Sequence, residues 1–263
     1  MTVSICIASY NGAQFIKEQI DSILAQDLSA YPGSLLEIIV SDDGSTDGSL
    51  DIIRSYADPR IKIITHKGKK REKHYTALYA ATANFANAIK HTTGDYIFLA
   101  DQDDIWYPNK ISHTLAELIK NGGGVCAAEF DVMTGDGVVY GRMNYKMEPF
   151  WRIKRQCMPY GFSLGFSRDM LKYIMPMPKV HQHDSFICLL AQRLNKLYFL
   201  HESTAAHRWL GEKNTSSSSM QEPIWQIIKS KIIWIRALAL LDDKIMSSDA
   251  EIQKFRPLQI MVS

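Results

Sequence analysis

The sequence predicts an α/β fold in which a mostly parallel central sheet is flanked by helices. Along the first half of the chain, short apolar and β-prone runs alternate with segments whose apolar residues recur at helical spacing. The β-prone runs are residues 3–8, 36–41, 61–65 and 96–100, and the helical segments are 13–26, 50–56, 75–91 and 108–120. Such alternation implies parallel strands that are joined by right-handed crossovers.

The second half of the chain loses this regular alternation. Its patterns are, in order, a hairpin at 125–139 around an Asp-Gly turn, an aromatic strand at 160–167, a helix that begins within 181–184, and a last strand at 197–200. We therefore predict a smaller mixed or antiparallel extension of the same sheet.

One large domain is expected over residues 1–215, with a first half at 1–106 and a second half at 107–215. The run of serines at 216–219 then indicates a linker, and residues 224–241 have the pattern of an apolar helix with cationic side chains. This tail helix is expected to pack on the domain or on a partner. The alternative is a helix that lies in the plane of a membrane.

Composition places the chain among ordinary globular proteins. With 263 residues, of which 46% are hydrophobic, it can bury a large core. Its formal net charge of +2 provides no extended positive field, which argues against nucleic acid as the main partner. The basic run at 67–73 is interpreted as a solvated loop.

The cysteines and the N-terminus predict a cytoplasmic protein. The four cysteines are far apart and form no Cys-x-x-Cys pair, so reduced thiols are expected at Cys6, Cys126, Cys157 and Cys188. The first residues enter a strand without the charged and apolar regions of a signal peptide. No stretch reaches the roughly 18 uncharged apolar residues that a membrane span needs.

Residues 94–106 are the most informative segment, because an apolar run ends there in three carboxylates within four positions. At such spacing Asp101, Asp103 and Asp104 repel one another and raise one another's pKa values. A divalent cation would relieve the repulsion, and carboxylate oxygens are the ligands that Mg²⁺ and Mn²⁺ prefer. The alternative is a solvated acidic turn that binds nothing.

Polar clusters follow three of the predicted strands, at residues 9–12, 42–47 and 101–104. The carboxyl ends of parallel strands share one edge of a sheet, and ligands bind at that edge in open α/β folds. The three clusters together favour a binding site over three unrelated turns.

Four motifs carry a resemblance to a known family. They are SICIASYNG at 4–12, SDDGSTD at 41–47, GDY with DQDD at 94–104, and the pair His183-Asp184. With them the chain resembles, over about residues 2–215, the family 2 glycosyltransferases, which have the GT-A fold and a Rossmann-like sheet. The pattern is most similar to bacterial enzymes of the rhamnosyltransferase type.

This resemblance implies inverting transfer of a sugar from a nucleotide diphosphate donor, of the dTDP-rhamnose or UDP-hexose type. The implied acceptor is a hydroxyl of a growing bacterial surface polysaccharide such as O-antigen or capsule, carried on a polyprenyl diphosphate. A Mn²⁺ or Mg²⁺ ion would stabilise the charge that develops on the leaving diphosphate. A single carboxylate that takes the acceptor's proton suffices for one displacement with inversion.

Roles for individual residues follow from the same resemblance. Tyr10 and Asn11 would hold the base or ribose, and Asp42 would bind the base. Asp103 would bind the metal, and Asp184 would be the catalytic base. The full predicted donor-binding set is Ser9, Tyr10, Asn11, Asp42, Asp43, Asp101, Gln102 and Arg208.

Several of these residues have a structural alternative. Asp184 opens a helix and would serve as its N-cap. Asp43 would stabilise its own turn. Asp104 is interpreted as support for the turn, and Trp106 as core beneath it. His183 either tunes Asp184 or satisfies a local hydrogen bond, and the second role is favoured.

One departure from the family pattern concerns the metal. Many relatives have Arg-x-His-Gly after the last strand, whereas this chain has Leu210 where that histidine would fall. We expect His207 to substitute as a metal ligand, or Arg208 to neutralise the diphosphate by its charge.

Two other enzyme classes and one non-enzymatic function are alternatives to glycosyl transfer. A nucleotidyltransferase would have a glycine-rich basic loop after the first strand, and a phosphatase would place its acidic pair there. The chain has neither. A nucleotide-sugar-binding assembly protein without turnover is the remaining alternative, because of Leu210.

Overall fold

The computed structural model describes residues 1–66, 77–145, 159–178, 182–211 and 239. The basic run at 67–73, the serine linker and Cys157 lie outside these ranges, as does the predicted tail helix except for Ala239. Within them, no helix is long and apolar enough to cross a bilayer. The other three cysteines are free and buried, as predicted.

The first half of the chain forms the predicted parallel sheet. Its strands are β1 (Thr2–Ser9), β2 (Leu35–Asp42), β3 (Ile61–Thr65) and β4 (Tyr96–Asp101), joined by α1 (Ile16–Leu24), α2 (Ser49–Ser55) and α3 (Ala77–Lys90). All three strand pairings are parallel, in the order β3-β2-β1-β4. The strand–helix alternation therefore predicted this half correctly.

The second half extends the same sheet with mixed pairings, as predicted. Its elements are β5 (Ile105–Trp106), α4 (Lys110–Lys120), β6 (Val125–Met133), β7 (Val139–Met143), β8 (Leu164–Ser167), α5 (Leu171–Ile174), α6 (His183–Arg193) and β9 (Leu197–Arg208). The sheet order is β3-β2-β1-β4-β8-β6-β9-β5, with β7 on β6. β8 runs antiparallel between β4 and β6, so β6 and β9 again run parallel to the first strands. β7 and β5 pair antiparallel with β6 and β9, respectively.

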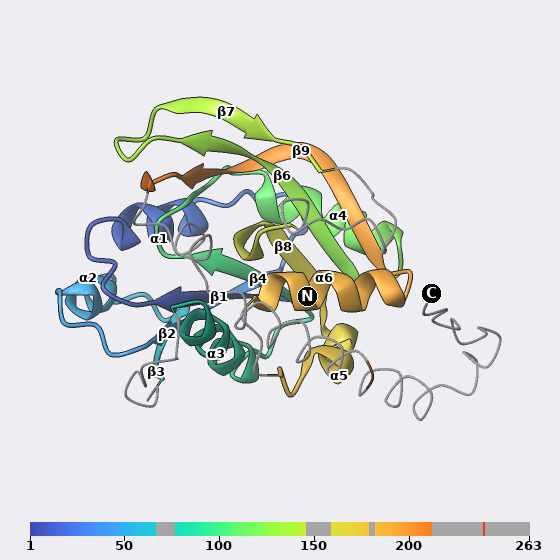
Figure 1. Ribbon diagram of the computed structural model, residues 1–263, viewed down its shortest axis with the longest axis horizontal. Coiled ribbons are helices and arrows are strands. Elements are labelled where there is room, and N and C mark those ends of the chain that lie inside the picture. Colours follow the sequence, from blue (N-terminus) through green and yellow to red (C-terminus); the bar gives the residue numbers. More distant parts are fainter. Residues whose placement is uncertain (67–76, 146–158, 179–181, 212–238, 240–263) are drawn as a thin grey trace, which may run out of the picture.

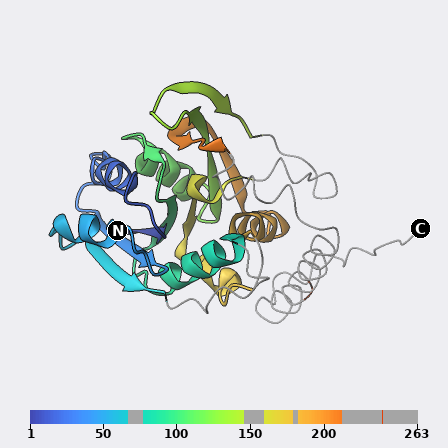
Figure 2. The same cartoon turned by 60° about the vertical axis from the view of Figure 1, so that its left-hand side comes forward.

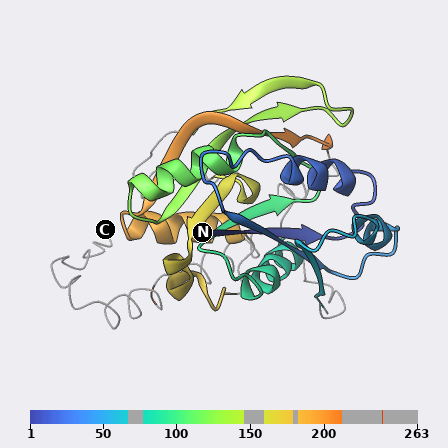
Figure 3. The same cartoon turned by 180° about the vertical axis from the view of Figure 1, so that it is seen from behind.

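Helices cover both faces of the sheet. In Figures 1 and 3, α3 and α6 lie on one face, and α1 and α4 on the other. The strands between them are buried on both sides, which explains why β1 and β4 are continuous apolar runs without alternation. The β6–β7 hairpin lies at the opposite end of the molecule from β3 (Figure 2).

The predicted end of the last strand was wrong. We expected it to stop at residue 200, but β9 continues to Arg208 and pairs with both β6 and β5. Its second half consists of small and polar residues such as Ser203 and Thr204, which give no apolar strand pattern although they are buried. Pairing with distant strands, rather than local periodicity, keeps this segment extended.

The topology brings five strand ends to one edge of the sheet. Ser9 pairs with Asp42, and Ala8 pairs with Asp101. On the other side of β8, Met133 at the end of β6 pairs with Arg208 at the end of β9. The polar residues that follow these strands therefore share this edge.

Candidate functional site

The loop after β1 is fixed by Gln102, which lies in the acidic turn after β4. The side-chain oxygen of Gln102 accepts the N–H of Tyr10 at 2.9 Å, and its amide nitrogen donates to the carbonyl of Tyr10 at 3.0 Å. A Cβ atom at Gly12 would overlap the same amide group. Gln102 is therefore bonded to the loop backbone, while the side chain of Tyr10 is 39% exposed at the edge of the sheet.

Because of this contact, Gly12→Ala and Gln102→Ala are expected to show strong energetic coupling. Gly12→Ala forces the Gln102 side chain away, at a cost of about 1–3 kcal/mol. Gln102→Ala removes two hydrogen bonds and costs a similar amount. In the double variant the overlap is gone, so its loss in free energy of unfolding falls short of the sum by about 1 kcal/mol or more.

Urea unfolding of the four proteins measures this coupling. Gly141→Ala on β7 is the matched control, because a Cβ atom at Gly141 would meet nothing within 4 Å. Its effect should add to that of Gln102→Ala. If the effects of Gly12→Ala and Gln102→Ala on the free energy of unfolding also add, the two residues do not contact each other in solution.

The loops after β1 and β2 are joined by Asn11. The N–H of Asn11 donates to the hydroxyl of Ser45 at 2.9 Å, and its side-chain oxygen accepts the N–H of Thr46 at 2.9 Å. Asn11 has a positive φ of 47°, which asparagine tolerates better than most residues. The N–H of Gly12 also donates to Ser49 at 2.8 Å. These bonds hold two of the three predicted polar clusters together.

Asp42 and Asp43 differ from each other in a way that the sequence did not reveal. Asp42 is buried and accepts the N–H groups of Gly44 and Ser45, both at 2.9 Å, so it is the residue that stabilises this turn. Asp43 instead contacts His66 at 2.9 Å and is not bonded within its own turn. Binding of a nucleotide base by either residue stays a prediction.

Ser9 lies beneath the surface of this edge. Its side chain is fully buried, and the hydroxyl has no hydrogen-bond partner among the residues that the structure describes. Its carbonyl accepts the N–H of Asp43 at 2.9 Å and the side-chain amide of Asn84 at 3.1 Å. Asn84 on α3 was not identified from the sequence, because its helix gives it no distinguishing pattern.

The three carboxylates after β4 have unequal surroundings. Burial and the charge of Asp104 raise the pKa of Asp103 to about 6, and the same two causes, with the charge of Asp103, raise the pKa of Asp101. Asp104 itself is fully buried. One of its oxygens accepts the backbone N–H of Arg208 at 3.1 Å and contacts the imidazole of His207 at 2.8 Å. Asp104 thus supports the turn, as predicted.

His207 is part of this acidic cluster. Burial alone would lower its pKa, but the nearby charges, above all that of Asp104, raise the pKa to about 9. Its ring stacks on Phe162, with centroids 4.9 Å apart and planes 9° apart. Nδ1 faces Asp104, whereas Nε2 is buried without a hydrogen-bond partner among the described residues.

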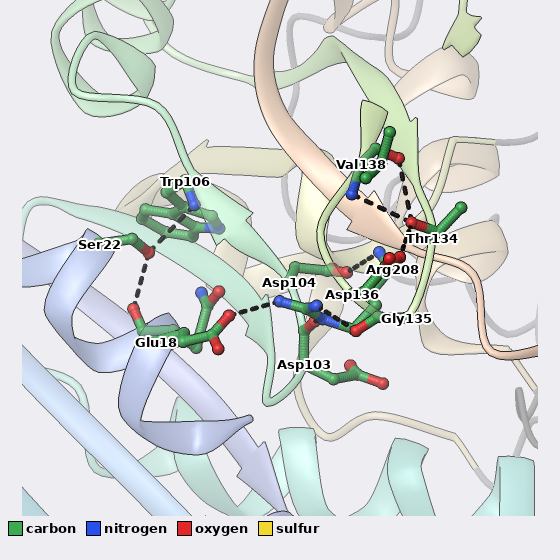
Figure 4. Close-up of polar contacts among 11 residues, drawn as sticks. Glu18, Ser22, Asp103, Asp104, Trp106, Thr134, Gly135, Asp136, Val138 and Arg208 are labelled. Carbon is green, nitrogen blue, oxygen red and sulfur yellow. Dashed lines mark hydrogen bonds and ion pairs between the residues drawn. The ribbon is translucent and has the colours of Figure 1, made fainter. Parts of the chain in front are cut away.

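Arg208 is held by protein groups on several sides (Figure 4). Its guanidinium donates to the carbonyls of Asp103 at 3.0 Å and Gly135 at 2.7 Å, and to the carboxylate of Glu18 at 2.6 Å. The side chain is 3% exposed. A contact between Arg208 and a donor phosphate stays a prediction.

The donor set fits a divalent cation in part. Figure 4 shows the carboxylate of Asp103 pointing away from Arg208. Nε2 of His207 has no hydrogen-bond partner among the described residues, while Nδ1 faces the carboxylate of Asp104. Histidines that bind a metal through one ring nitrogen commonly bond to a carboxylate through the other. Among the described residues, no three His, Cys, Asp or Glu side chains converge as ligands. Mg²⁺-type ions often take only one or two protein ligands and complete their shell with substrate phosphates.

Asp184 lies in the first turn of α6, near the acidic cluster. Its charge contributes to the raised pKa of Asp101. The N-cap alternative is wrong, because the N-cap position is Gln182 and no side chain caps the helix. Instead, an oxygen of Asp184 accepts the N–H of Ser185 at 2.6 Å. At the neighbouring His183, burial lowers the pKa, and the buried Nε2 has no hydrogen-bond partner among the described residues.

Three residues around this edge had no functional signal in the sequence. Glu18 on α1 binds Arg208, 190 positions away. Lys110 on α4 is buried with its amine 5.0 Å from the ring centre of Trp106, and burial lowers its pKa to about 8. Trp106 is itself buried under the turn, as predicted. Tyr160 has its ring centroid 5.5 Å from that of His207.

Comparison with known proteins shows the family of this chain. Residues 4–175 match the model of the family described as glycosyl transferase family 2. A curated relative from Escherichia coli is 24% identical over 84% of this chain and 81% of its own length. That relative, WfgD, is named a β-1,3-glucosyltransferase that uses UDP-Glc and α-D-GlcNAc-diphosphoundecaprenol.

Solved structures share the fold. TarS of S. aureus, crystallised as residues 1–349 with UDP-GlcNAc, has a TM-score of 0.62 and 19% identity, over 82% of this chain and 61% of that one. A mannosyltransferase from Pyrobaculum calidifontis, solved with GDP-Man and Mn²⁺, has a TM-score of 0.54 and 17% identity, over 93% and 74%. These likenesses agree with the predicted GT-A fold.

Proposed function

The chain belongs to glycosyl transferase family 2, and we propose that it transfers a hexose, with inversion, from a UDP-sugar to a saccharide on a polyprenyl diphosphate. The observation that carries the proposal is the shared edge of the sheet, where the loops after β1, β2 and β4 lie with His207 and Asp184 nearby. The names of WfgD and of the UDP-GlcNAc complex of TarS favour a UDP-sugar over dTDP-rhamnose.

In this proposal the two joined loops bind the nucleotide. Tyr10 has an exposed aromatic side chain on a backbone that Gln102 holds on both sides, so it is preorganised to stack on the base. Asn11 keeps the second loop at a fixed distance. Asp101, which is the last residue of β4, would face the sugar end of the donor.

Asp103 and His207 would hold a Mn²⁺ or Mg²⁺ ion, which when bound would offset the charge of the leaving diphosphate. Asp104 orients His207 by its hydrogen bond at 2.8 Å. Burial and the charge of Asp104 raise the pKa of Asp103, and a bound cation would relieve this repulsion.

Asp184 would accept the proton of the acceptor hydroxyl. The N–H of Ser185 holds its carboxylate at the start of α6, and Asp101 lies close enough to sense its charge. General-base catalysis of this kind contributes about 10² to 10⁴ in rate. A single base on the far side of the sugar from the diphosphate gives inversion.

A thermal-shift panel tests the donor. UDP-glucose, UDP-GlcNAc, dTDP-rhamnose and GDP-mannose are each added with Mn²⁺ and with chelator, because a ligand that binds only the folded state stabilises it. We expect a UDP-sugar at 100 times its Kd, with Mn²⁺, to raise Tm by several degrees, on the order of 5 °C. A panel in which no nucleotide sugar shifts Tm would contradict the proposal. Binding without any transfer would instead favour the non-catalytic alternative.

A further inference from the structure

Tyr160 lies beside His207 in the transfer site. Its ring centroid is 5.5 Å from that of His207, on the side of the proposed donor phosphates. Tyr160 directly precedes Gly161, whose backbone lies against the imidazole of His183, and His183 directly precedes the proposed base Asp184. An acceptor sugar has to occupy the space between leaving group and base, and Tyr160 borders that space.

A close contact brings Asp184 to Tyr160. A Cβ atom at Gly161 would lie 2.5 Å from Nε2 of His183, so the start of α6 approaches this backbone as only a glycine permits. His183 also packs on Phe85, with ring centroids 4.3 Å apart. The position of Asp184 relative to Tyr160 is therefore determined by packing.

The ring of Tyr160 is fixed, but its hydroxyl is not used. The ring packs edge-on against Phe130 at 5.4 Å, its N–H donates to the hydroxyl of Tyr145 at 3.1 Å, and its carbonyl accepts the N–H of Ser163 at 3.0 Å. Among the residues that the structure describes, nothing bonds to its own hydroxyl. A half-buried tyrosine usually bonds its hydroxyl, so a fixed ring with an unused polar tip fits a ligand site.

We propose that Tyr160 is the binding platform for the acceptor sugar, a pyranose attached to a lipid diphosphate. One face of the pyranose packs its C–H groups on the aromatic ring, and the tyrosine hydroxyl bonds to a sugar substituent. This orientation directs the reacting hydroxyl of the sugar to Asp184. The inference rests on the proposed function, because it takes the acceptor to be a saccharide and Asp184 to be the base.

The test measures binding of a defined probe, α-GlcNAc diphosphate with an undecyl tail, by calorimetry in the presence of UDP and Mn²⁺. We expect Tyr160→Leu to weaken probe binding at least tenfold, because the platform is lost. Tyr160→Phe keeps the ring and its packing on Phe130, and it should weaken the probe about three- to tenfold through the missing hydrogen bond. Tyr140→Leu, at a tyrosine that is 59% exposed on β7, is the matched control and should change nothing.

The Kd of UDP in the same samples separates the two proposals. Two outcomes would overturn the role of Tyr160 but not the proposed function. In one, the wild-type protein binds UDP but not the probe. In the other, the variants at Tyr160 bind the probe as the wild type does. A wild-type protein that binds neither UDP nor any nucleotide sugar would overturn the proposed function. If Tyr160→Leu loses UDP binding through misfolding, Tyr160→Phe decides.

Discussion

We expect Asp184→Asn to lower the rate of sugar transfer by about 10²- to 10⁴-fold, because an amide cannot accept the proton of the acceptor hydroxyl. The substitution preserves shape, and the amide oxygen can still accept the N–H of Ser185. UDP binding and Tm should therefore stay near those of the wild type. The measurement is transfer to the lipid-linked probe at saturating donor, with calorimetry of UDP alongside.

Asp51→Asn is the matched control for this experiment. Asp51 also lies in the first turn of a helix, but its side chain is 85% exposed on α2. It should transfer sugar at the wild-type rate. If Asp184→Asn does the same, another group takes the proton and the assignment of the base is wrong.

The second large effect is expected at Asp103. Asp103→Ala should weaken UDP binding at least about tenfold in Mn²⁺ and leave it unchanged in chelator, since losses of this size follow when a metal site is disturbed. The backbone carbonyl that accepts the Arg208 guanidinium remains in the variant, so the turn should keep its shape. Calorimetry of UDP in both buffers, for wild type and variant, gives the comparison.

Asp136→Ala controls for the loss of a negative charge near the same edge. Asp136 lies on the β6–β7 turn, where its carboxylate accepts a hydrogen bond from the hydroxyl of Thr134. It also interacts electrostatically with Arg208. Asp136→Ala should not change the Mn²⁺ dependence of UDP binding. Equal weakening of UDP binding by Asp103→Ala with and without the metal would remove Asp103 from the metal site.

The parallel half of the fold could be predicted because its signals are local. A buried strand between two helical layers is a continuous apolar run, and a helix repeats its apolar residues every three or four positions. The end of β9 had no such signal. Its buried small residues, such as Thr204, are extended because β5 and β6 pair with them, and those partners are distant in sequence.

The acidic turn after β4 could likewise be placed at the ligand-binding edge, because parallel strands end on the same side of a sheet. What each polar residue contacts could not be predicted. Asp42, rather than Asp43, stabilises its turn, and the departure at Leu210 did not indicate that Asp104 would hold His207, 103 positions away. Such bonds depend on side-chain distances that no sequence spacing encodes.

The family pattern, the strand–helix alternation of the first half and the edge at which the polar clusters meet could be predicted, because these depend on periodicity and on the residues that follow each strand. Which groups touch at that edge depends on the folded chain. Gln102 reaches Tyr10 across 92 positions, and Glu18 reaches Arg208 across 190. Contacts between residues so far apart form only when the helices pack on the sheet, so no local sequence pattern indicates them.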